Sequence, residues 1–332
     1  MLLAFTCTAS TQTAAPIQLT PVGATLQTIT AVSDVSRKTT AATPTAKPTP
    51  TEAAPTATIA AAATPGQPVS ATAVAVSPDG RIVVAVNPDS DSVTVLDAES
   101  LQILNEIPVG DDPRTLAIAP DSQSALVANH AGATLSLLDL SQLLEAGSYA
   151  VGSMPYGVVT DGARAFVSEL ARGNVNVLNW STGELLARIT VAPFPTGLAL
   201  SADRASLYVT HLFSGRVTLI DTRSLEVKAN ITTGASTNLS QFVAISPNGD
   251  KAYLPQTRSN VTNTAMLFDS TVFPVVNVLD LGAFRLIVRE RVTLDTADRP
   301  VNMPFAVALS PDGKMLYLAN AGSDDLSVID LS

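Results

Sequence analysis

The sequence predicts an all-β fold made of repeated four-stranded antiparallel units, and three observations support it. A similar segment recurs six times, with a turn residue in each copy, at Asp79, Asp121, Asp161, Asp203, Asn248 and Asp312. Each repeat contains short runs rich in Val, Ile, Leu, Thr and Tyr, separated by Gly, Pro, Asp and Asn, as is typical of strands joined by tight hairpins. No helical pattern of about 10–15 residues lies between the runs, which argues against a parallel α/β sheet.

The repeated segments read AVSPDGRIVVAVN, AIAPDSQSALVAN, VVTDGARAFVSE, ALSADRASLYVTH, AISPNGDKAYLPQ and ALSPDGKMLYLAN. Their turn residues lie 40 to 45 residues apart in the first five copies, and 64 residues separate the fifth copy from the sixth. In the fourth unit we expect strands at LALS, SLYVT, RVTLID and LEVKANIT. Repeats of this length with four strands each predict a β-propeller.

Six repeat units are visible, and we expect six or seven blades, of which the last is incomplete in this chain. The sequence ends at LSVIDLS, after the third strand of the sixth unit. Because a propeller ring must close, either a strand near Ile17–Thr30 completes the last blade or the chain belongs to a longer protein. We favour the longer protein.

Upstream of the repeats, two segments differ from the rest in composition. Residues 1–7, MLLAFTC, resemble a shortened lipoprotein signal that ends at Cys7, although no positive charge precedes a very short apolar run. The alternative is an unstructured end with a chance cysteine. Residues 8–70 are rich in Thr, Ala and Pro, which predicts an extended, solvated tether. The propeller is expected over 71–332.

The segments SLYVTHLFSGRVTLID and MLYLANAGSDDLSVID resemble the YVTN-type β-propeller repeats of bacterial and archaeal extracytoplasmic proteins. The resemblance covers residues 71–332 and recurs six times, so it is specific for the fold and weak for function. It implies a location outside the cytoplasm, at the cell surface or in the periplasm. Members of that family include surface-layer proteins, and some related propellers work with haem-containing redox domains.

Composition excludes several classes of function. A net charge of −10 argues against nucleic-acid binding, which needs a basic surface. With one cysteine, no internal disulfide, Cys-based metal site or CxxCH haem attachment is available. No apolar run approaches the roughly 18 residues of a transmembrane helix, so a lipid at Cys7 is the only anchor we consider. We expect no bound cofactor and no metal.

A polar residue follows each turn residue by eight positions, at Asn87, Asn129, Glu169, His211, Gln256 and Asn320. This column ends the second strand of each blade, so we interpret His211 mainly as a turn residue and only secondarily as a ligand. The other histidine, His130, lies two repeats earlier. Two histidines on non-adjacent blades are too far apart to share one ion, which normally needs three or four ligands.

The binding site is predicted on the face that carries the connections between blades and the turns after the second strands, which we call the upper face. The fifth repeat has an insertion here, expected as the loop TRSNVTNTAMLFDSTVFP, and a long connection follows it. Insertions of this kind often form the binding face. The candidate residues are Arg258, Asn260, Met266, Phe268, Phe273, Arg299, Met303, Phe305, Arg114, Tyr156, Phe194 and His211. Pro113, Pro155, Pro195 and Pro304 are expected to begin innermost strands.

These observations predict a non-enzymatic, extracytoplasmic binding propeller, whose partner is a protein or another ligand on the upper face. The alternative is the propeller part of a redox protein whose haem- or quinone-linked domain lies on another segment or partner. A third hypothesis, a lactonase- or lyase-type enzyme, needs converging acids or histidines near the central channel, and the sequence shows no such set. None of the motifs GxSxG, P-loop or HExxH is present.

Overall fold

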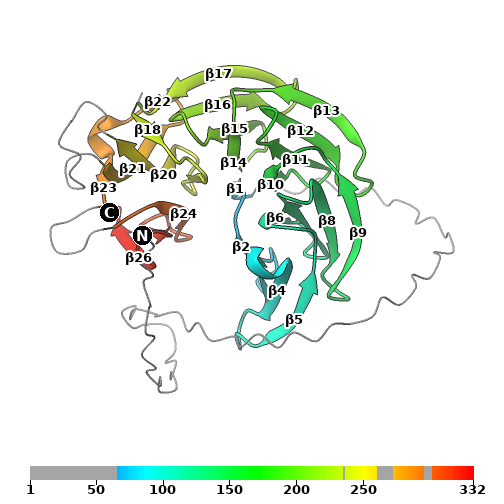
Figure 1. Cartoon of the computed structure of the whole chain (residues 1–332). Coiled ribbons are helices and arrows are strands. Elements are labelled where there is room, and N and C mark those ends of the chain that lie inside the picture. Colours follow the sequence, from blue (N-terminus) through cyan, green and yellow to red (C-terminus); the bar gives the residue numbers. More distant parts are fainter. Residues whose placement is uncertain (1–65, 235, 260–271, 295–300) are drawn as a thin grey trace, which may run out of the picture. The chain divides into compact units, whose positions relative to one another are not determined.

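The structure is a computed structural model that describes residues 66–234, 236–259, 272–294 and 301–332. Apart from two single-turn 3-10 helices, Pro88–Ser90 and Val288–Glu290, the regular elements described are strands. They form six antiparallel sheets, arranged as blades around a central channel (Figure 1). The predicted all-β propeller is therefore confirmed. No helix in the described ranges is long and apolar enough to cross a membrane.

The first four blades each have four core strands in sequential order from the channel outward. The first consists of β2 (Val74–Val76), β3 (Ile82–Asn87), β4 (Ser92–Asp97) and β5 (Ile103–Pro108). The second consists of β6 (Pro113–Ile118), β7 (Ser124–Asn129), β8 (Thr134–Asp139) and β9 (Leu144–Ala150). The third consists of β10 (Pro155–Thr160), β11 (Arg164–Glu169), β12 (Asn174–Asn179) and β13 (Leu185–Thr190). The fourth consists of β14 (Pro195–Leu200), β15 (Ser206–His211), β16 (Arg216–Asp221) and β17 (Glu226–Thr232).

The last two blades depart from this plan. In the fifth, the inner strand is split into β18 (Thr237–Asn238) and β19 (Ala244–Ile245), and the outer strand into β22 (Arg285–Leu286) and β23 (Val292–Thr293). Between them lie the long strands β20 (Lys251–Ser259) and β21 (Val272–Asp280). The sixth blade has three strands, β24 (Pro304–Leu309), β25 (Met315–Asn320) and β26 (Asp325–Asp330). The four predicted prolines each begin an innermost strand.

The turns between first and second strands follow from their sequences. In the first blade the Asp79 carboxylate accepts hydrogen bonds from the Ser77 hydroxyl and from the backbone N–H of Arg81. Gly80 follows with φ 74°, a conformation that glycine adopts without strain. Asp312 and Gly313 repeat the arrangement in the sixth blade. These turns lie opposite the upper face, on what we call the lower face.

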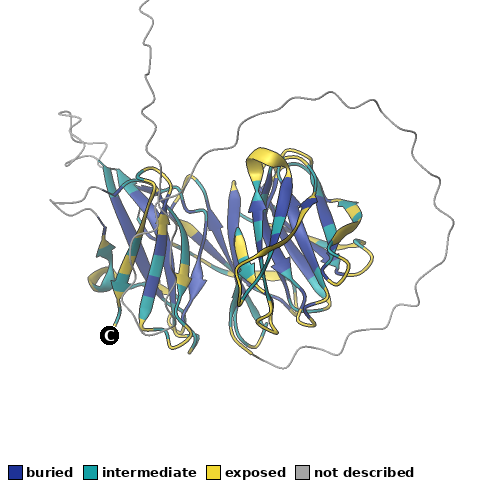
Figure 2. Ribbon diagram, turned by 90° about the horizontal axis from the view of Figure 1, so that it is seen from below, coloured by how far each residue is buried: buried dark blue, intermediate teal, exposed yellow. Residues whose placement is uncertain are grey.

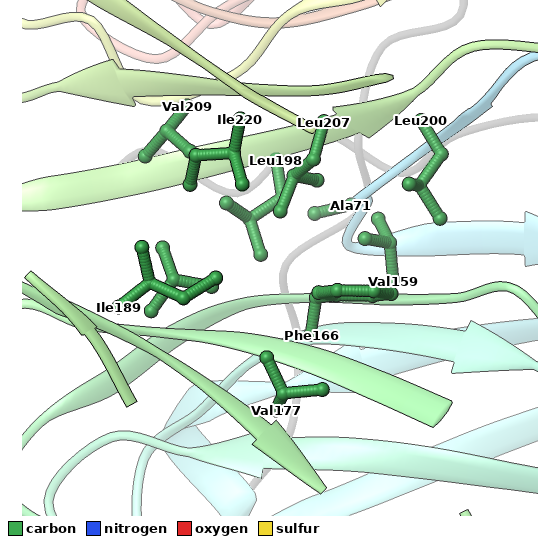
Figure 3. Close-up of a cluster of buried hydrophobic side chains, with 11 residues drawn as sticks. Ala71, Val159, Phe166, Val177, Ile189, Leu198, Leu200, Leu207, Val209 and Ile220 are labelled. Carbon is green, nitrogen blue, oxygen red and sulfur yellow. The ribbon is translucent and has the colours of Figure 1, made fainter. Parts of the chain in front are cut away.

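Five hydrophobic clusters hold the blades together, one in each junction from first–second to fifth–sixth. Figure 3 shows the cluster between the third and fourth blades, where Phe166 and Ile189 face Leu198, Leu207 and Ile220. In the second, third and fourth blades the three inner strands are largely buried, whereas the outer strands and most turns are exposed or half-buried (Figure 2). Truncating one such leucine to alanine would cost about 2–5 kcal/mol.

One strand, β1 (Val69–Ser70), lies in the channel and pairs with the inner edge of β14. The same segment continues to the second and first blades: Leu116 N–H donates to the carbonyl of Thr72, and Val86 N–H to that of Ala73. Gln67, at its start, accepts a hydrogen bond from Arg204 in a lower-face turn. The described chain thus enters the channel from the lower face, and strand β1 lies within the range predicted as tether.

Candidate functional site

The upper face is built around a backbone corner that recurs before the innermost strands. Asp112, Met154, Phe194, Leu239 and Met303, which we call the corner residues, have φ between 50° and 58°. In four of the corners the carbonyl of this residue accepts an N–H from the second-to-third strand turn, as Phe194 does from Leu212 and Met154 from Leu170. For a residue with a side chain, this left-handed conformation costs roughly 1–2 kcal/mol, so the surrounding hydrogen bonds must hold it.

The corners present apolar side chains to solvent. Met154, Phe194 and Met303 are exposed, and Phe194 makes an edge-to-face pair with Phe213, with ring centroids 5.0 Å apart. Phe213 lies in the turn between β15 and β16 and is 60% exposed, against 42% for Phe194. Two paired aromatic rings, fixed by a constrained backbone and open to solvent, form a ready contact surface. We call Met154, Phe194, Phe213 and Met303 the apolar rim.

Inside the apolar rim, aromatic rings from four blades meet at the mouth of the channel. Tyr156 lies edge-on to His130 at 5.8 Å, and Phe242 contacts both Tyr156 and Phe305, at 6.4 and 4.8 Å between centroids. The Tyr156 hydroxyl donates to Oε1 of Gln241. Burial raises the pKa of Tyr156 above its ordinary value, with a smaller opposing influence from Arg114, so the hydroxyl stays protonated. These rings therefore contact one another at the upper end of the channel, inside the apolar rim.

Arg114 lies beside this group and is held by a neighbouring carboxylate. Its Nη2 is 2.9 Å from Oδ2 of the corner residue Asp112, and its side chain is about one-third exposed. Such a partly exposed pair contributes little stability. It orients a guanidinium at the edge of the mouth, where a partner can contact it.

The polar residues that follow each turn residue by eight positions, which we call the polar column, have a structural role. This role explains why a polar residue recurs at this position. In every repeat except the fifth, the column residue ends the second strand and bonds to a side chain on the third strand. Five of these pairs are seven residues apart: Asn87–Thr94, Asn129–Ser136, Glu169–Asn176, His211–Thr218 and Asn320–Ser327. In the fifth repeat, Gln256 bonds Asn277 across the insertion. The column therefore ties neighbouring strands together at the upper end of each blade.

His211 fits this column and is fully buried. Its Nε2 lies 2.9 Å from the Thr218 hydroxyl and its Nδ1 lies 3.1 Å from the carbonyl oxygen of Pro193. In the neutral ring Nδ1–H donates to the Pro193 carbonyl, and Nε2 lies against the Thr218 hydroxyl, whose own proton is donated to Oδ1 of Asn230. Burial lowers the pKa of His211 to about 4, against the smaller opposite influence of the Pro193 carbonyl. Both ring nitrogens therefore contact other groups of the protein, and neither is free for a metal or a partner. The structure places His211 at the buried end of β15 and not in the predicted turn.

Among the described residues, no group of three or more His, Cys, Asp or Glu side chains is placed to hold a metal ion. His130 is separate from His211: its Nδ1 lies 3.2 Å from the carbonyl oxygen of Pro155, and its ring packs on Tyr156.

The predicted insertion is partly a strand extension. β20 and β21 are each nine residues long, and Arg258 pairs with Phe273 beyond the height of the other blades. The expectation of a loop over 257–274 was therefore wrong at both ends, because its alternating Thr, Val and Phe residues continue the hairpin. Asn260, Met266, Phe268, Arg299, Cys7 and the segment Ile17–Thr30 lie outside the described residues.

The remaining predicted site residues lie on the upper face at different depths. Phe194 and Met303 belong to the apolar rim, whereas Tyr156 and Phe305 lie at the mouth. Sequence reasoning missed Phe213, Met154 and Phe242. Phe213 had a usable signal, since a large aromatic residue in the polar turn HLFSG has no place in a hydrophobic core. Phe242 had none, because its repeat lacks the proline that marks the start of four other inner strands.

A family model described as "Lactonase, 7-bladed beta-propeller" matches residues 31–147, which is less than half of the chain. No curated protein sequence gives a significant match. Hydrazine synthase of Kuenenia stuttgartiensis is similar in structure, with a TM-score of 0.71 and 21% identity over 78% of this chain and 76% of that one. A functionally unknown protein from Desulfotomaculum acetoxidans DSM 771 gives 0.63 and 13% over 79% and 82%. The β-propeller domain of Myceliophteria thermophila Cps50 (Swd1) gives 0.53 and 10% over 80% and 100%. At these identities the likenesses concern the fold.

Proposed function

We propose that this chain is a non-enzymatic binding propeller whose apolar rim docks a partner protein. The observation that carries the proposal is the Phe194–Phe213 pair, which is exposed, contiguous and held by a left-handed corner. An aromatic anchor that is already ordered loses little conformational entropy when it binds. Aromatic side chains of this kind supply a large share of the energy in many protein interfaces.

Two observations favour rim binding over chemistry inside the propeller. Tyr156, Phe242 and Phe305 pack on one another at the mouth of the channel, and column residues such as Asn129 and His211 are engaged in internal hydrogen bonds. The segment around β1 lies in the channel beside β14. The match to a lactonase family model leaves an enzymatic function as the alternative. An assay of lactone hydrolysis by the purified chain tests this alternative directly.

We further propose that the propeller works outside the cytoplasm, held by a lipid at Cys7. This rests on the sequence of the first residues and on the YVTN-type resemblance. The chain enters the propeller through the lower face, at Gln67.

A second candidate is the propeller part of a redox assembly, favoured by the fold likeness to hydrazine synthase. Both candidates use the rim, and they differ in the partner. A partner with haem absorbance would favour the redox assembly, and a partner without a redox group would favour the binding scaffold.

The test replaces the aromatic pair. The double variant Phe194→Ser/Phe213→Ser should bind the partner purified from the native source at least roughly tenfold more weakly, as expected for an interface anchor. The matched control is Leu185→Ser/Leu186→Ser, which removes two similarly exposed apolar side chains from the outer strand β13. Both variants should keep the wild-type melting temperature. Equal loss in both variants, or unchanged affinity in the aromatic variant, would overturn the proposal.

A further inference from the structure

Two arginines of the fifth blade, Arg258 and Arg291, lie at the upper end of its junction with the fourth blade. Successive residues of a strand point to opposite faces, so Arg258 shares its face of β20 with Leu254, which packs against the fourth blade. Arg291 lies between the second 3-10 helix and β23, on the outer side of the fifth blade. Both arginines are half-buried. We call them the arginine pair.

Arg291 is held in place by neutral groups alone. Its Nε donates to Oδ1 of Asn277 at 2.6 Å, and its Nη2 donates to the carbonyl oxygen of Thr233 at 3.4 Å. Asn277 is fixed in turn, because its Nδ2 donates to Oε1 of Gln256 and both amides are fully buried. A guanidinium carries five N–H donors, so within the described residues these two bonds leave its remaining donors available to a ligand.

Arg258 is brought beside Arg291 by two sets of contacts. Thr237 is the register partner of Arg258, and its hydroxyl donates to the same Thr233 carbonyl that accepts from Arg291. Gln256, the next residue on the same face of β20, bonds the amide that binds Arg291. Burial lowers the pKa of Arg291, and the positive charge of Arg258 lowers it further, as expected for neighbouring like charges.

The arginine pair has no counter-ion among the described residues. Neither side chain belongs to any of their ion pairs, whereas Arg164, for example, lies 2.6 Å from a carboxylate oxygen. Arg216, which is exposed at the upper start of β16 and pairs with Thr232, also lies outside these ion pairs. Positive charge thus gathers at one place in a chain whose net charge is −10. Neighbouring guanidinium groups repel each other, and an anion between them removes this repulsion.

We propose that the arginine pair binds an oxyanion, namely a carboxylate or a phosphate group. Two guanidinium groups offer planar sets of N–H donors that match the paired oxygens of these anions. The site adjoins the apolar rim, because Gly215, two residues after Phe213, donates its N–H to the Thr237 carbonyl at 2.8 Å. The oxyanion therefore comes from one of two sources, an acidic side chain of the partner that docks on the rim or a free phosphate ligand.

The experiment is isothermal titration of the full chain with sodium phosphate at pH 7.5 and low ionic strength. The wild-type chain should bind one phosphate, and Arg258→Gln should weaken binding at least roughly tenfold, as expected for loss of a charge-assisted contact. Arg258→Lys should lose less, since it keeps the charge without the planar donors. The matched control is Arg223→Gln, which removes an exposed arginine from a lower-face turn outside the ion pairs of the described residues and should bind phosphate as the wild type does.

A second titration, with a capped tripeptide that has glutamate between two leucines, distinguishes the two sources. Tighter binding of the tripeptide than of phosphate, weakened by Arg258→Gln and by Phe194→Ser/Phe213→Ser, would support the acidic side chain of a partner. Binding of phosphate alone would support a free phosphate ligand.

Two results would overturn the oxyanion site: binding of neither probe, or equal weakening by Arg258→Gln and Arg223→Gln. The rim variant Phe194→Ser/Phe213→Ser should leave phosphate binding unchanged, because the phosphate contacts only the arginines. Failure of the rim proposal and failure of the oxyanion site are therefore distinguishable. Every variant should keep the wild-type melting temperature in buffer without phosphate, so that lost binding reports the site and not the fold.

Discussion

At the scale of single residues, the polar column shows how one position accepts different side chains for one purpose. Asn, Glu, Gln and His all bond a side chain on the third strand, as His211 does through Thr218. Glu169, His211 and Gln256 also bond the loop before the innermost strand, whereas Oδ1 of Asn129 and Oδ1 of Asn320 are buried without a partner among the described residues. We expect His211→Asn to be tolerated, because Asn fills this position in three other repeats. His211→Leu should lose about 1–3 kcal/mol per partner left unpaired. Urea denaturation at pH 8 checks this, and equal stability of the two variants would contradict it.

The same histidine makes stability depend on pH. Burial lowers the pKa of His211 to about 4 in the folded protein, against about 6.5 in the unfolded chain. Between these values the unfolded state binds a proton that the folded state does not, so stability falls as pH falls through this window. The loss is at most roughly 3 kcal/mol, at about 1.4 kcal/mol per pKa unit. His211→Asn should flatten the urea-derived stability curve between pH 7 and 4.5, while His130→Asn should keep most of its slope.

At the scale of elements, the turns between third and fourth strands share one geometry, which can be predicted in part from the sequence. An Asp or Asn ends the third strand and accepts N–H groups two or three residues on, as Asp97, Asp139, Asn179 and Asp221 do. The residue four positions later has positive φ, whether it is Leu101, Leu143, Gly183, Leu225 or Phe284. The polar residue is visible in the sequence of each copy, whereas the positive φ is not, because leucine gives no signal of a left-handed conformation.

Gly183 leaves room for the ring of Tyr149, from the preceding blade, to pack against its turn. A Cβ at this position would lie 2.2 Å from Cγ of Tyr149, whose hydroxyl donates to the Ser181 carbonyl. We expect Gly183→Ala to lower the free energy of unfolding by about 1–3 kcal/mol beyond its backbone strain. Gly80→Ala is the control, because Gly80 has a similar φ and nothing within 4 Å of a Cβ. Chemical denaturation compares them, and equal losses would mean that Tyr149 simply moves aside.

At the scale of the whole molecule, the propeller could be predicted because the sequence repeats. The features that depart from the repeat could not be predicted. Six copies of one pattern specify strands, order and faces, since each copy buries the same positions against its neighbour. The upper face was predicted for the same reason. The mouth was not, because Tyr156, Phe242 and Phe305 come from different blades and meet only when the ring forms. The hairpin extension at Arg258 and Phe273 lies where the repeat itself breaks.

The last departure, the segment at residues 67–73, gives a prediction about the molecule as a unit. It bonds the fourth, second and first blades through Leu198, Leu116 and Val86, and Ala71 is buried in the cluster between the third and fourth blades. A chain that starts at Val74 should therefore be several kcal/mol less stable than one that starts at Gly66, since the buried N–H of Leu116 loses its acceptor at a cost of about 1–3 kcal/mol and the edge of β14 loses its paired strand. Urea denaturation of the two truncated chains, neither of which carries residues 1–65, isolates this segment. Coincident unfolding curves would mean that the segment only occupies the channel, and that the blades hold the inner edges of the propeller together without it.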